Sequence, residues 1–132
     1  MIIKANNSAL KSWINVNKDS DFPIQNLPFG VFSYDKLSPR IGVAIGNYIL
    51  DLKCLFELGY LKNLGFTQKD FDNCYLNDMM MHGKSATREL RDRISNLLNI
   101  ESDELKNNDK HKAEAVISQA NATMHLPVKI GD

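Results

Sequence analysis

Neither sign of charge is in excess in this sequence, and long apolar runs are missing. Lysine and arginine number 16 among 132 residues and aspartate and glutamate also number 16, so the formal net charge is zero. This balance supplies no basic surface of the kind that binds nucleic acid or an anionic membrane. Charges or glycines interrupt every apolar stretch before the roughly 20 residues that a membrane helix needs. We therefore expect no nucleic-acid partner and no membrane partner.

The first residues lack the apolar core of a signal peptide, because only Ile2 and Ile3 precede Lys4 and two asparagines. Cysteine is scarce too. Cys54 and Cys74 stand among apolar neighbours, with no second cysteine or histidine at a zinc-site spacing. Buried free thiols are favoured over a metal or redox site, and these features together predict a cytoplasmic protein.

The composition that is present is that of an ordinary globular domain. Hydrophobic residues make up 43% of the sequence and charged residues 24%, which argues against global disorder. A chain of 132 residues fits one domain and can bury roughly two-thirds of its unfolded surface. Since no internal repeat or low-complexity tract interrupts the sequence, a single hydrophobic core is expected.

Short β-type segments follow an irregular polar arm of about twenty residues. Prolines keep Phe22–Leu27 extended, because the residue before a proline avoids the helical region. Three strands are predicted, at 29–34, 40–45 and 48–52. Asp35–Pro39 reads as a turn, and Gly46-Asn47 has the dihedral freedom of a tight hairpin. Brief strands rich in β-branched and aromatic residues are typical of a small barrel, and Gly42 suggests a bulge or bend.

After Asp51 the apolar period changes to that of a helix. A short helix is predicted from Leu52 to Leu58, and Phe71, Cys74, Tyr75 and Met79 recur at helical spacing. A stronger helix spans Lys84–Asn99. Its apolar stripe consists of Ala86, Leu90, Ile94, Leu97 and Leu98. Its other face reads most simply as a solvated surface and carries Arg88, Glu89, Arg91, Asp92 and Arg93.

The segment 99–115 is the most polar part of the sequence. It is either a short helix capped by Ser102 or a mobile loop. From Val116 the chain is predicted to return as an extended strand, since Pro127 rules out a helix there. The sequence therefore predicts an α+β domain with a small β-meander, following helices and one returning strand.

No catalytic constellation is visible in the residue pattern. His82 and His111 read as exposed surface residues, whereas His125 faces either solvent or a small polar pocket. A base needs an acidic or nucleophilic partner nearby, and only residues distant in the sequence could serve His125. Gly42 and Gly46 lack the following helix of a phosphate loop.

Two further features of the sequence are explained by ordinary structure without a binding site. Asp19, Asp21 and Asp132 do not show the converging oxygens that a Ca²⁺ or Mg²⁺ site requires. The run Met79–Met81 either packs a helix end against the core or offers an adaptable contact surface. We assign no catalytic, cofactor-binding or metal-binding residue from these patterns.

Two blocks of the sequence resemble a known family. Residues 12–33 (SWINVNKDSDFPIQNLPFGVFS) with 39–52 (PRIGVAIGNYILDL) look like the N-terminal domain of the fumarylacetoacetase family. Residues 117–132 (ISQANATMHLPVKIGD) look like the stretch that joins that domain to the catalytic domain. The intervening Lys53–Ala115 matches in helical pattern alone, and 99–112 is expanded.

The resemblance implies a small SH3-like β-barrel with two to three added helices. It implies a domain over residues 1–117 and, over 118–132, the start of a linker to a C-terminal catalytic domain. The family hydrolyses a carbon–carbon bond of 4-fumarylacetoacetate to fumarate and acetoacetate in tyrosine and phenylalanine catabolism. There a carboxylate-held divalent cation, Ca or Mg, binds the substrate, and a histidine paired with an acid activates water.

By the same resemblance, none of that machinery falls on this chain. His125 matches the histidine of the family's M-H-L-P string, which is not the base, and Asp132 precedes the metal-binding aspartate. We therefore expect a fragment that is inactive alone. Its partners would be its own catalytic domain and, in the full-length enzyme, a second copy. Leu126, Val128 and Ile130 would contact the catalytic domain or close the barrel.

A second hypothesis belongs to another class: a free-standing SH3-like adaptor or regulatory module without catalysis. Such barrels bind partners through aromatic grooves. The candidate aromatic residues are Trp13, Phe22, Phe29, Phe32, Tyr34 and Tyr48. Aromatic residues in short strands are more often part of the core, so the enzyme-domain hypothesis is preferred.

Overall fold

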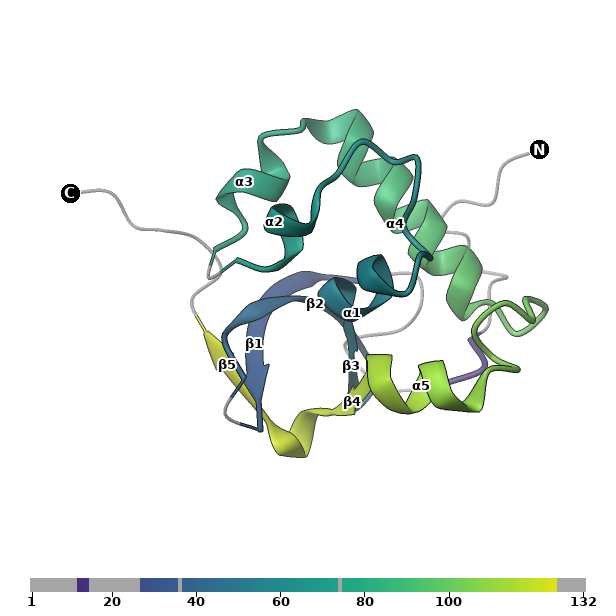
Figure 1. Ribbon diagram of the computed structural model, residues 1–132. Coiled ribbons are helices and arrows are strands. Elements are labelled where there is room, and N and C mark those ends of the chain that lie inside the picture. Colours follow the sequence, from purple (N-terminus) through teal and green to yellow (C-terminus); the bar gives the residue numbers. More distant parts are fainter. Residues whose placement is uncertain (1–11, 15–26, 36, 74, 126–132) are drawn as a thin grey trace.

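The computed structural model describes residues 12–14, 27–35, 37–73 and 75–125 (Figure 1). Most of the polar arm and most of the predicted extended segment 22–27 lie outside these ranges. The following positions singled out by the sequence also lie outside the described residues: Asp19, Asp21, Phe22, Pro23, Cys74, Leu126, Val128, Ile130 and Asp132.

The fold is α+β and contains one five-stranded antiparallel sheet of order β4-β3-β2-β1-β5. The strands are β1 (Phe29–Tyr34), β2 (Arg40–Ile45), β3 (Tyr48–Asp51), β4 (Val116–Ser118) and β5 (Ala122–His125). The three predicted strands are confirmed, except that the third ends at Asp51 because Leu52 already begins a helix. Gly46 adopts φ 56° in the predicted two-residue turn between β2 and β3.

The chain returns as two strands, where the sequence predicted one. β4 and β5 lie at opposite edges of the sheet, and the 3-10 turn Gln119–Asn121 joins them. Three extended residues reach only about 10 Å, so the sheet has to curl until these edges approach one another. Figure 1 shows the strands curving in this way. Among the described residues β4 and β5 do not pair, so the sheet is not closed and the predicted barrel is not confirmed.

The helices are more numerous and shorter than the two to three predicted. They are α1 (Leu52–Glu57), α2 (Gln68–Phe71), α3 (Asn77–Met80), α4 (Lys84–Leu98) and α5 (Asp109–Ala115). The periodicity through Phe71, Tyr75 and Met79 does not form one helix. Asp72 leaves the helical region, and the Asn73 side chain accepts a hydrogen bond from the Tyr75 backbone N–H, which favours a turn. In the described ranges no helix is long and apolar enough to cross a membrane.

The helices cover one face of the sheet and form the main core with it. Val31, Ile41, Val43 and Leu50 point to this face and are fully buried. The predicted stripe of α4 is confirmed, because Leu90, Ile94, Leu97 and Leu98 are also fully buried and Ala86 packs against the same core. Burying an apolar helix face against the sheet is the main stabilising contribution.

The other face of the sheet is packed around a glycine. A Cβ atom on Gly42 would lie 2.5 Å from Phe32 Cε1 and 2.7 Å from Ile49 Cγ2. The pairing is regular there, with Gly42 opposite Gly30 on one side and Asp51 on the other. Of the predicted bulge or bend at Gly42, the bulge is therefore wrong, and the glycine makes room for two buried side chains.

The polar segment after α4 is tied to the domain by specific contacts. Arg93 donates two hydrogen bonds to the Glu104 carboxylate, at 2.8 and 3.1 Å, and a third to the Tyr60 carbonyl. Tyr60 Oη lies 2.6 Å from His111 Nδ1. Asn108, not Ser102, caps α5, so the alternative in which Ser102 caps a short helix is wrong.

The charged face of α4 is only in part the solvated surface that its sequence predicted, because Arg88 and Glu89 are exposed but the following charged residues are partly buried. Besides Arg93, Arg91 donates to the Leu27 carbonyl and lies 4.6 Å from the centre of the Phe29 ring. Burial lowers the pKa of Arg91. The end of α4 also holds the short described piece near the N-terminus, because Trp13 Nε1 donates to the Leu97 carbonyl at 2.8 Å.

We predict that Gly42→Ala destabilises the fold by about 1–3 kcal/mol, because the new methyl group overpacks Phe32 and Ile49. Gly30→Ala is the matched control, since a Cβ there would meet only Met124 Cε at an ordinary 3.4 Å. Urea denaturation of both variants measures the difference. Equal midpoints for the two variants would contradict this packing argument.

Candidate functional site

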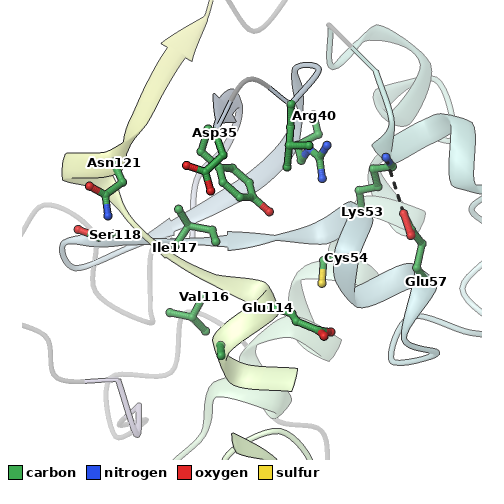
Figure 2. Close-up of a pocket in the computed structure, with 13 residues that line it drawn as sticks. Asp35, Arg40, Lys53, Cys54, Glu57, Glu114, Val116, Ile117, Ser118 and Asn121 are labelled. Atoms are coloured by element: carbon green, nitrogen blue, oxygen red, sulfur yellow. Dashed lines mark ion pairs between the residues drawn. The ribbon is translucent and has the colours of Figure 1, made fainter. Parts of the chain in front are cut away.

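A hollow of about 700 Å³ opens between α1, α5 and the turn that joins β1 to β2. Figure 2 shows Lys53, Cys54 and Glu57 of α1 on one side. Glu114 and the strand residue Val116 lie on another side, and Arg40 belongs to the sheet. The hollow brings together segments that are more than 70 residues apart in the sequence.

The inner wall of the hollow is organised by the Asp51 carboxylate. Its Oδ2 lies 3.3 Å from Arg40 Nη1 and accepts a hydrogen bond from Tyr34 Oη at 3.0 Å. Its Oδ1 accepts from the backbone N–H of Cys54 at 3.1 Å and so caps α1. The strand register brings Arg40 and Asp51 together. Asp51 pairs with Gly42, and Arg40 is the next residue of β2 on the same face as Gly42.

Burial dominates the protonation of this cluster. Asp51 is fully buried, and burial raises its pKa although the Cys54 N–H, Arg40 and Tyr34 each lower it. Burial and the neighbouring Asp51 also raise the pKa of Tyr34. They raise the pKa of Cys54 to about 12, so its thiol stays protonated at neutral pH and is a poor nucleophile.

The rim of the hollow carries charges of both signs. Lys53 Nζ lies 3.8 Å from both Glu57 Oε1 and Asp72 Oδ2, and Asp35 and Glu114 add further carboxylates. Across the described ranges no three His, Cys, Asp or Glu side chains are placed to hold a metal ion. The hollow can bind polar groups, but its described residues do not form a nucleophile–base pair.

The structure keeps the three histidines apart and gives each a partner. His125 is exposed on β5, and its Nε2 lies 2.8 Å from Ser33 Oγ. His82 Nε2 lies 2.9 Å from the buried Asp70 carboxylate, and His111 contacts Tyr60. His82 is exposed, as predicted, whereas His111 is only partly exposed, so the prediction for His111 is wrong. None of the three is among the described residues that line the hollow.

The methionine run and the aromatic residues divide between the core and the surface. Met79 is fully buried, whereas Met80 and Met81 are 56% and 84% exposed, so each reading of this run fits part of it. Phe32 is buried in the sheet and Tyr34 lies in the hollow, while Tyr48 is exposed, so these aromatic residues do not line one groove. Cys54 is a free thiol, as predicted, but it is half-buried where a buried one was expected.

The Asp51 cluster was not predicted from the sequence. One signal was present, because Asp51 stands where the apolar period changes from two to 3.6, the position of a helix cap. Its partners Tyr34 and Arg40 lie 17 and 11 residues earlier, and only the strand register brings them to the same carboxylate.

Comparison with known proteins identifies the class of this domain. A family profile described as fumarylacetoacetase N-terminal matches residues 25–127. The chain is 48% identical over 122 residues to the fumarylacetoacetase of Rattus norvegicus, covering 92% of this chain and 29% of that protein. It is 47% identical over 122 residues to the Homo sapiens protein, with the same coverage. It is 38% identical over 128 residues to the Arabidopsis thaliana protein, covering 93% of this chain and 30% of that protein.

The chain therefore corresponds to the N-terminal domain of larger proteins. It spans less than a third of the length of these relatives. It belongs to the fumarylacetoacetase family. The predicted resemblance is confirmed, and the free-standing adaptor is not favoured.

We predict that Tyr34→Phe lowers the free energy of unfolding by about 1–3 kcal/mol, because Asp51 loses a buried hydrogen bond. Tyr48→Phe is the control, since Tyr48 is exposed and its substitution should change stability by less than about 0.5 kcal/mol. Chemical denaturation measures both. If the Tyr34→Phe variant is as stable as the Tyr48→Phe variant, this hydrogen bond makes no net contribution to the free energy of unfolding.

We also predict a pH dependence with a defined sign. Because the folded state binds the Asp51 proton more tightly than the unfolded chain does, this group stabilises the fold most at low pH. Its contribution is lost as pH rises from the ordinary value of 3.8 through the raised pKa. The unfolding free energy of the unmodified chain, minus that of Asp51→Asn, should therefore fall as pH rises from 3 to 7, measured by urea titrations. A difference that grows with pH would mean that attraction to Arg40 outweighs burial.

Proposed function

We propose that this chain is the N-terminal domain of a full-length hydrolase that cleaves the carbon–carbon bond of 4-fumarylacetoacetate. Water adds across that bond, so that hydroxyl goes to the acyl carbon and hydrogen to the other carbon, giving fumarate and acetoacetate. The observation that carries the proposal is 47–48% identity to named fumarylacetoacetases over 92% of this chain.

In this proposal the reacting groups lie in the part of the protein that follows. A divalent cation, Ca or Mg, and a histidine base would sit there. The described residues of this chain do not fit a metal, because no three suitable side chains converge. His125 does not fit a base either, since its described partner is the Ser33 hydroxyl and not a carboxylate. The role of this chain is then to fold, and to support the catalytic domain.

Other features of the whole protein belong to the same proposal. The enzyme would be a homodimer whose N-terminal domain contacts its own C-terminal catalytic domain. A cytoplasmic location agrees with the free Cys54 thiol. The curl that brings the edge strands together through a three-residue turn supports an SH3-like barrel that is partly open.

The division into a domain over 1–117 and a linker over 118–132 also stays a proposal. Strand β5 falls within 118–132 and pairs with β1. The first part of such a linker would therefore be built into the sheet.

We predict that the full-length gene product releases fumarate and acetoacetate from 4-fumarylacetoacetate and that the 132-residue chain does not. Chromatographic product analysis measures both, and a cooperative thermal transition of the 132-residue chain controls for its folding. Turnover by the short chain above the uncatalysed rate would contradict the assignment of the reacting groups. A folded full-length protein without turnover would contradict the proposed reaction.

A further inference from the structure

A second depression lies on the face of the sheet opposite the main core. It has a volume of about 190 Å³, several times the roughly 30 Å³ that one water molecule occupies in the liquid. Its lining includes Phe29, Gly30, Gly42, Ala44 and Met124. None of its described lining residues carries a charge, so it is a groove for apolar groups.

The groove exists because small residues face each other across β1 and β2. Gly30 and Gly42 are direct cross-strand partners, and Ala44 follows on the same face of β2. One wall is Met124 of β5, which pairs with Phe32 and reaches over Gly30. Met124 is 58% exposed, so this wall lacks a covering group among the described residues.

We propose that this groove is a docking site for apolar side chains of the polypeptide that follows this chain in the full-length protein. The inference rests on the proposed function only in requiring that such a polypeptide exists. The matched profile is that of an N-terminal domain, and the chain covers 29% of its relatives, so the larger remainder follows on the C-terminal side. β5, which carries the wall residue Met124, is the last described strand before that remainder.

Tethering decides which occupant fits the groove. A groove of this size buries far less than the roughly 1,200 Å² that a stable interface between separate molecules needs, which disfavours a second copy. A segment joined to β5 has a high effective concentration at the groove and needs only a small contact area to remain bound. The apolar lining selects aliphatic or aromatic side chains, since a charged group would lose its hydration there without gaining a partner.

The test uses two methionines with matched exposure. Met124 and Met80 are 58% and 56% exposed in this chain, and methionine oxidation depends on access to the sulfur. The 132-residue chain and the full-length protein are treated with hydrogen peroxide, and sulfoxide at each position is followed by peptide mass spectrometry. We expect similar rates at both positions in the short chain. In the full-length protein the ratio of the Met124 rate to the Met80 rate should fall about tenfold.

A pair of variants locates the protection. Ala44→Leu in the full-length protein fills the groove and should return the Met124-to-Met80 ratio toward that of the short chain. Ala113→Leu makes the same change at the other hollow and should leave the protection in place. Thermal transitions of the two variants in the 132-residue chain report whether either change disturbs the fold.

An unchanged ratio in the full-length protein would overturn the proposal. Protection of Met124 that appears in the short chain as its concentration rises would also overturn it, in favour of a second copy. Failure of the docking proposal can be distinguished from failure of the proposed function. Turnover without protection refutes only the docking site, and protection without turnover refutes only the hydrolase.

Discussion

The Asp51 carboxylate holds four parts of the domain in one arrangement. It ends β3, caps α1 through the Cys54 N–H, pairs with Arg40 on β2 and accepts from Tyr34 on β1. Because Asp51 is fully buried, a displaced partner cannot be replaced by bulk water without opening the structure. The angle between the first helix and the sheet is fixed by this geometry, and with it the shape of the hollow beside α5.

A steric constraint acts on the same strands. The missing side chain at Gly42 lets Phe32 and Ile49 approach the β2 backbone, which fills the space inside the curled sheet. Its partner Gly30 leaves the apolar groove beside Met124. The domain therefore presents a polar hollow and an apolar groove on a scaffold without an assembled catalytic group among its described residues. That division agrees with the proposal that this domain of the fumarylacetoacetase family supports a catalytic domain.

The parts of the fold that sequence alone predicted are those set by local periodicity and turn chemistry. The three strands, the turn at Gly46 and the stripe of α4 follow from such patterns, and the family followed from long matching strings. The features that the sequence did not predict depend on contacts between residues far apart in the sequence. Gly42 suggests a bulge or bend, and its neighbours in the sequence do not show that Phe32 lies against it. Arg93 reads as solvated, because its contact with Glu104 forms only when that segment folds back onto the helix. The pattern of residues that are adjacent in the sequence does not specify how distant segments pair. It therefore could not place Tyr34 beside Asp51.

Native-state hydrogen exchange of the Cys54 amide tests the central claim most directly. Amides in the first turn of a helix normally exchange through local opening, because they lack a partner within the helix. If Asp51 joins α1 to the sheet as one cooperative unit, the Cys54 amide should exchange with the same opening free energy as the buried β2 amides of Ile41 and Val43. A Cys54 amide that exchanges orders of magnitude faster than those of β2 would show that the junction opens independently, and the account would be wrong.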